Sequence, residues 1–110
     1  MTYTQGDIVE VNFLFPNGTF KPHPAIIVSN DQLQLDDDTI YIVLISSKNY
    51  NPQYSYTITP DMIDVALPKQ SYIKCHLIVA NTHRDIIKKI GKFRQPYLDQ
   101  AIDKIIESIF

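Results

Sequence analysis

Hydrophobic residues follow strand-like spacing along most of this chain and change to helical spacing only near its C-terminal end. Between Asp7 and Phe13, apolar and polar residues largely alternate, as expected for a strand with one buried face. From Tyr97 onward the apolar residues recur three and four positions apart, which places them on one face of a helix. Pro96 suits the start of that helix, because the first helical position needs no N–H donor. The chain is therefore predicted to combine short strands with one terminal helix.

Several further segments have the length and composition of strands, and turn-forming or polar stretches separate them. Asn30–Asp38 contains three consecutive aspartates and is interpreted as an acidic loop, whereas Asn17-Gly18 marks a turn within Phe15–Thr19. Short strands with one terminal helix favour a mainly β fold, a small barrel formed by residues 1–110 as a single domain. The predicted strands are Asp7–Phe13, Ala25–Ser29, Thr39–Ile45, Tyr54–Ile58, Ser71–Val79 and Ile86–Phe93.

Charge and cysteine content restrict the classes of partner and compartment. The formal net charge is −2, so the chain lacks the overall basic excess of most dedicated nucleic-acid binders and would need a local basic patch. The single cysteine, Cys75, cannot form an internal disulfide and is interpreted as a small buried residue in a reducing compartment. No apolar run approaches the roughly 20 residues that span a bilayer, and the N-terminus lacks signal-peptide features. We therefore expect a cytoplasmic protein without a membrane partner.

The strongest candidate for chemistry is a histidine between two prolines, Pro22-His23-Pro24. Pro24 disfavours helix at His23, and Pro22 has its own φ angle fixed. The sequence predicts a rigid turn that holds the imidazole at the start of the buried strand Ala25–Ser29, where it would titrate near neutral pH.

Ser46, Ser47 and Lys48 follow the strand Thr39–Ile45, and in a barrel they could meet His23 at one rim. A histidine, two hydroxyls and a cation suit cleavage of an RNA phosphodiester, because the RNA 2′-hydroxyl is itself the nucleophile. The alternative is that His23 is only a turn residue and the two serines only cap a strand.

Lys21 and Lys48 are the candidates for attracting phosphate, and Asn17 and Thr19 in the first loop are further candidate RNA contacts. The aromatic residues near these segments could stack on bases, but most are interpreted as core residues or cross-strand pairs.

No metal site or cofactor is expected. Cys75 and His76 are adjacent and would point to opposite faces of a strand, which is unsuitable for shared metal binding. His76 is interpreted as a partly buried strand residue and His83 as a turn residue, neither with an assigned role.

Four stretches, in this order, resemble the PemK/MazF family of bacterial toxins, and the match extends over nearly the whole chain. The resemblance implies an SH3-like barrel, a homodimer, metal-independent cleavage of single-stranded RNA, and an antitoxin protein that blocks the site. The matching stretches are Gly6–Phe13 with Lys21–Ser29 after a Gly-containing loop, Ile42–Ser47, Ser71–Cys75, and Ile86–Phe93 followed by a helix.

The chain departs from the family pattern at its most important position. The family usually has Arg-Pro where this chain has His23-Pro24, and a neutral imidazole stabilises developing charge less well than a guanidinium. Ser46 matches the family's strand-end hydroxyl, whereas a second arginine or acid downstream of Ser71 has no clear match, with Val79 and Ala80 near that place.

Two other functions therefore remain open. The related CcdB-type proteins share the fold and poison DNA gyrase through a protein interface that involves the C-terminal helix. A catalytically inactive member of the family would bind only RNA or its antitoxin.

Overall fold

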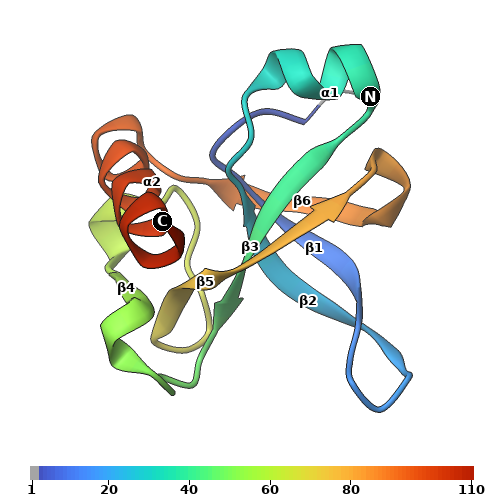
Figure 1. The fold of residues 1–110 in the computed structure, drawn as a ribbon. Coiled ribbons are helices and arrows are strands. Elements are labelled where there is room, and N and C mark those ends of the chain that lie inside the picture. Colours follow the sequence, from blue (N-terminus) through green and yellow to red (C-terminus); the bar gives the residue numbers. More distant parts are fainter. Residues whose placement is uncertain (1–2) are drawn as a thin grey trace.

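A six-stranded antiparallel sheet forms most of the computed structural model, which describes residues 3–110 (Figure 1). The strand order is β4-β5-β3-β2-β1-β6. Short 3₁₀ turns cover Pro52–Tyr54, Pro60–Met62 and His83–Asp85. The strands are β1 (Asp7–Leu14), β2 (Phe20–Ile27), β3 (Ile40–Ser46), β4 (Ser55–Ile58), β5 (Ser71–Asn81) and β6 (Ile86–Lys92), and the helices are α1 (Asp31–Asp37) and α2 (Gln95–Ile109).

The central strands are buried on both faces and separate two hydrophobic cores. One core lies under α2, where Leu98, Ala101 and Ile105 pack against sheet residues such as Ile26 and Val43. The other core lies on the opposite face and contains Val9, Val11, Ala25, Ile27, Ile42 and Leu44. Successive residues alternate between the two cores, as side chains of a strand must. The predicted mainly β fold with one C-terminal helix is confirmed.

The two edges of the curved sheet are joined at one end. Ile63, which follows β4 and its short turn, forms an antiparallel bridge with Phe93, directly after β6. The N–H of Asp64 donates to the carbonyl of Lys92 at 3.1 Å, and the N–H of Lys92 donates to Asp64 Oδ1 at 2.7 Å. Gly91 permits this contact, because a Cβ there would collide with Val65. This connection gives the sheet its barrel-like curvature.

The predicted acidic loop at Asn30–Asp38 is wrong, because Asp31–Asp37 forms the helix α1. Asn30 caps its start, with Oδ1 accepting a 3.0 Å hydrogen bond from the N–H of Leu33. Asp38 ends it in the left-handed region, with φ 48°. The helix has no buried residue, so the sequence has no apolar stripe there, and only the capping asparagine marks its start.

The prediction that His23 lies in a turn is also wrong, because β2 already begins at Phe20. His23 pairs with Val11 of β1, whereas β3 pairs only with residues 25–27 of β2. Pro22 and Pro24 therefore lie where the other edge of β2 is unpaired, so their missing N–H groups interrupt no ladder there. The turn itself is at Phe15–Thr19, where Gly18 has φ +85°, as the Asn-Gly pair predicts.

Candidate functional site

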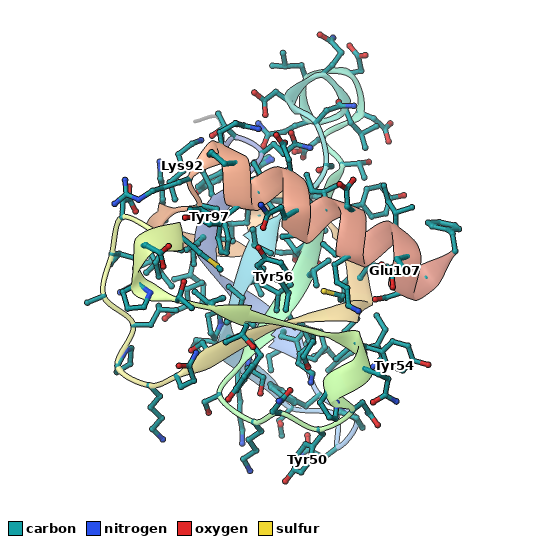
Figure 2. The ribbon with its side chains drawn as sticks, turned by 90° about the vertical axis from the view of Figure 1, so that its left-hand side faces the viewer. Tyr50, Tyr54, Tyr56, Lys92, Tyr97 and Glu107 are labelled. Atoms are coloured by element: carbon teal, nitrogen blue, oxygen red, sulfur yellow. The ribbon has the colours of Figure 1, made fainter. Side chains whose placement is uncertain are left out.

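His23 and Ser46 lie on the face of the sheet opposite α2. Ala25 and Leu44 belong to the core on that face, and His23 and Ser46 are each two residues away along their strands. Figure 2 shows Tyr56 beneath α2, where its hydroxyl donates to Gln100, and Tyr50 at the end of the molecule away from the helix.

Two neighbouring hollows share His23, Ser46 and Lys48 as lining residues. The first has a volume of about 400 Å³ and is completed by Ser47, by Leu67 and Lys69 of the loop before β5, and by Ser71 at the start of β5. The second, of about 380 Å³, is completed by Tyr50, Asn51, Lys74 and His76. The structure thus brings together the histidine, both serines and one lysine of the sequence-based site.

A third hollow of about 250 Å³ continues this series beyond the first. It is lined by Leu67, Pro68, Lys69 and Ser71, which the first hollow also uses, and by residues that follow β4. Through these shared lining residues, the first hollow adjoins both the second and the third.

His23 is half-buried, and burial lowers the pKa of its imidazole below the usual 6.5, while a backbone hydrogen bond with Ile45 opposes that change. The imidazole is therefore neutral at pH 7. A neutral histidine that donates one N–H to a carbonyl keeps its second nitrogen as a proton acceptor, as a general base requires.

Ser46, Ser47 and Lys48 differ in exposure: Ser46 is partly buried and the other two are exposed. Ser46 Oγ accepts a 3.1 Å hydrogen bond from the N–H of Lys48, so this serine does cap the strand end, as in the alternative interpretation. Its hydroxyl proton can still be donated toward the hollows that Ser46 lines.

A bulge in β5 adds two ionisable residues that the sequence analysis did not assign to the site. Val43 pairs with Ile78 and Ile45 pairs with Ile73, so residues 74–77 of β5 lie opposite Leu44 alone. Lys74 and His76 lie within this bulge and line the second hollow with His23.

Lys74 is buried, and its ammonium donates hydrogen bonds to the Tyr50 carbonyl and, at 2.7 Å, to Ser55 Oγ. Burial lowers the pKa of this lysine from its usual 10.5. Two neutral acceptors use two of the three ammonium N–H donors, and within residues 3–110 no carboxylate forms an ion pair with Lys74, so its positive charge is not neutralised by a neighbour.

His76 is partly buried, as predicted, and its ring packs on that of Tyr54 with centroids 4.8 Å apart. Its Nδ1 is buried and has no hydrogen-bond partner within the structure. The imidazole nitrogen is thus free to bond with a group that enters from outside the described chain. The only sequence signal for this pair was the alternation of Lys74 and His76 with the apolar Ile73 and Cys75.

The remaining candidates lie along the hairpin that precedes His23. Asn17 and Thr19 bond to each other, with Asn17 Oδ1 accepting from the backbone and side chain of Thr19, and neither lines the three hollows described above. Lys21 is exposed, and its ammonium lies 6.0 Å from the centre of the Phe15 ring. The structure therefore places Lys21 beside the site and leaves Asn17 and Thr19 within their own turn.

Cys75 is fully buried, as interpreted from the sequence, and burial raises the pKa of its thiol to about 11. Within residues 3–110, no group of three or more His, Cys, Asp or Glu side chains is arranged to hold a metal ion. Neither helix in the described part of the chain has the length and apolar character needed to cross a membrane.

Comparison with solved structures finds the same fold in bacterial toxins, at identities too low to show more than the fold. An endoribonuclease solved in complex with its cognate antitoxin, from a mycobacterial species, has a TM-score of 0.76 and 13% identity over 96% of this chain and 92% of that one. A chain of a MazE–MazF crystal structure from Deinococcus radiodurans has a TM-score of 0.78 and 12% identity, over 97% of this chain and 95% of that one. The Mycobacterium tuberculosis toxin MazF-mt6 has a TM-score of 0.69 and 14% identity over 94% and 99%.

A search of the curated proteins finds no match to the chain. The family model described as the PemK-like, MazF-like toxin of type II toxin–antitoxin systems matches residues 4–109, which include every strand and all of α2. With a match of this extent, the chain belongs to the PemK-like, MazF-like family of type II toxins.

Proposed function

We propose that this protein is an endoribonuclease that cleaves single-stranded RNA without a metal ion, as the toxin of a toxin–antitoxin pair. The observation that carries the proposal is the clustering of His23, Ser46, Lys48, Lys74 and His76 around two adjoining hollows. Family membership and the solved neighbour named as an endoribonuclease support the same activity.

In this mechanism, His23 removes the proton from the RNA 2′-hydroxyl, and the 2′-oxygen attacks the adjacent phosphorus. The bond from phosphorus to the 5′-oxygen breaks, which leaves a 2′,3′-cyclic phosphate on one fragment. The departing 5′-oxygen takes a proton, for which His76 is the candidate donor, and becomes a 5′-hydroxyl.

The charge that develops on the phosphoryl oxygens needs stabilising groups around them. Lys48 and Lys74 supply positive charge, and the Ser46 and Ser47 hydroxyls supply hydrogen bonds. Lys74 takes over part of what the family arginine would provide, because its ammonium is fixed and largely desolvated.

The test is cleavage of a long single-stranded RNA by the purified protein with EDTA present, with the product ends identified chemically. We expect 5′-hydroxyl and cyclic-phosphate ends, and His23→Ala should lose on the order of 10²–10⁴-fold in rate. The matched control is His83→Ala, because His83 is exposed and bonds to Asp38 instead. Cleavage by His23→Ala at the parent rate would contradict the assigned base.

The proposal includes a protein partner and a second copy of the chain. Solved neighbours include complexes with a cognate antitoxin or with MazE, and we infer an antitoxin that covers these hollows with a segment that folds on binding. It should co-purify with this chain and suppress cleavage. We also infer a two-fold homodimer, which light scattering should detect at roughly tens of micromolar.

A protein-directed toxin is the second candidate function. The observation in its favour is the exposure of Ile106 and Phe110 at the end of α2, where Phe110 is 96% exposed. If the parent chain does not cleave RNA and instead inhibits DNA supercoiling by gyrase, this function replaces the nuclease.

A further inference from the structure

Three aromatic rings pack together where the β1–β2 hairpin meets the candidate site. The His23 imidazole lies 5.8 Å from the Phe15 ring at 72° and 6.2 Å from the Phe13 ring at 43°, between centroids. Phe13 and Phe15 themselves meet edge to face at 5.0 Å. The hairpin thus places two phenylalanine rings against His23, which also lines both hollows.

Phe13 and Phe15 differ in their relation to the core. Phe13 packs partly against the core on the face opposite α2, so its burial is expected whatever His23 does. Phe15 belongs to neither core and lies at the start of the turn, where its partly buried ring packs on Phe13 and His23 and lies under the Lys21 ammonium. The Phe15 ring therefore contacts the imidazole without contributing to either core.

We propose that Phe13 and Phe15 are positioning residues that hold the His23 imidazole neutral and aimed at the shared hollows. The catalytic part of this inference rests on the proposed function. An apolar wall favours the neutral imidazole over the cation, and edge-to-face packing restricts rotation of the ring. An imidazole kept neutral in this way can accept a proton, so histidine can act as a base at this position.

Other groups near His23 can also change its protonation. Their effect must be distinguished from the effect of the Phe13 and Phe15 rings. Lys21 lies over Phe15, and the hollows add Lys48, Tyr50, Lys69, Lys74 and His76 from the neighbouring strands and loops. β1 faces His23 with Val11, its strand partner, and with Phe13. The nearby cations and the two phenylalanine rings both disfavour the protonated imidazole. The experiment therefore needs separate variants for the cations and for the rings.

The experiment is an NMR titration of the His23 ring in the intact protein, compared across Phe15→Leu, Phe15→Ser and Phe13→Leu. We expect the titration midpoint to rise in each variant, and Phe15→Ser to give the largest rise, about half a pH unit or more, because it admits water. Phe20→Ser is the matched control, because Phe20 lies in the same hairpin and is 60% exposed. Lys21→Gln measures the contribution of the nearest cation.

The proposal is overturned if the titration midpoint in Phe15→Ser equals that of the parent. It is also overturned if Phe15→Ser no longer raises the midpoint when both proteins compared carry Lys21→Gln. A midpoint that rises only in Phe13→Leu would overturn it for Phe15. In the cleavage assay, the acid limb of kcat/KM should move to higher pH by the same amount as the midpoint. A parent chain that does not cleave RNA would disprove the proposed function, and the titration would still decide whether the wall controls His23.

Discussion

Asp7 is a buried ionisable residue that lies away from the candidate site. Its side chain is 3% exposed, and its Oδ1 lies 3.3 Å from Lys89 Nζ and 3.4 Å from Lys92 Nζ. Burial by itself would raise the pKa of this carboxyl, but hydrogen bonds from the backbone and side chain of Thr4 and from Lys89 outweigh burial and hold the pKa below 3.8. Asp7 therefore links the N-terminal segment to β6 as a carboxylate.

A carboxyl whose pKa is lower in the folded chain stabilises the fold at pH values above its unfolded pKa, and this contribution is lost as pH falls through the folded pKa. Asp7→Asn should therefore lower the free energy of unfolding at pH 7 by about 1–3 kcal/mol. The difference from the parent should shrink at pH values below 3.8. Urea unfolding across this range measures both, with Asp103→Asn on the exposed surface of α2 as control.

The pH dependence of cleavage is the second prediction at the scale of single residues. Because burial lowers the pKa of His23, a His23 base stays active to lower pH than an ordinary histidine, and cleavage is lost as pH falls through that lowered pKa. The acid limb of kcat/KM should have its midpoint below 6.5.

His23→Arg, which restores the usual family residue, should lack this limb, because guanidinium does not titrate in this range. An identical acid limb in the parent and in His23→Arg would assign the titration to a group other than His23.

At the scale of elements, α1 is held by hydrogen bonds at its two ends and not by buried side chains. The Asn30 cap and the left-handed Asp38 define it, and Asp38 also accepts from His83 Nδ1 at 2.7 Å, which ties the helix end to the β5–β6 connection. Since α1 buries no residue, its loss should stay local and leave the sheet intact.

Asn30→Ala should destabilise α1 by about 1 kcal/mol through loss of the cap. Amide hydrogen exchange should quicken within residues 31–37 and stay unchanged in β1 to β3. The control is Gln32→Ala, which removes only an exposed side-chain bond to Asp36. Faster exchange throughout the sheet would show that α1 supports the whole fold.

At the scale of the whole molecule, the bridge between Ile63 and Phe93 connects sheet closure to the candidate site. The same chain segment continues as the loop of residues 64–70, whose Leu67 and Lys69 line the first hollow. The close contact of Gly91 with Val65 therefore contributes both to closing the sheet and to shaping the site.

Gly91→Ala should push the segment at Val65 away from β6, because the added Cβ would overlap Val65 and Asp64. We expect a loss of about 1–3 kcal/mol in the free energy of unfolding, the usual cost of overpacking. NMR shift changes should reach loop 64–70. The comparison variant is Gly18→Ala, which strains a φ of +85° but meets no neighbour, so its shift changes should stay within the β1–β2 turn.

The sequence by itself determined those helices and strands in which apolar residues recur at regular spacing. The alternation in β1 and the helical stripe of α2 predicted these elements, and Asn17-Gly18 predicted the turn between β1 and β2. These signals are local, because a buried face imposes its period on neighbouring residues. The helix α1 buries no residue, so its apolar residues do not recur at helical spacing, and the sequence analysis did not predict it.

Only the tertiary structure decided which residues share the candidate site. Alternation divides a strand into two faces, but the docking of α2 determines which face stays accessible, and this placed His23 and Ser46 on the uncovered one. Lys74 and His76 reached the same hollow because β5 lies next to β3 and bulges opposite Leu44. Pairing between distant strands, and the burial that lowers the pKa of His23, arise only from packing of the whole chain.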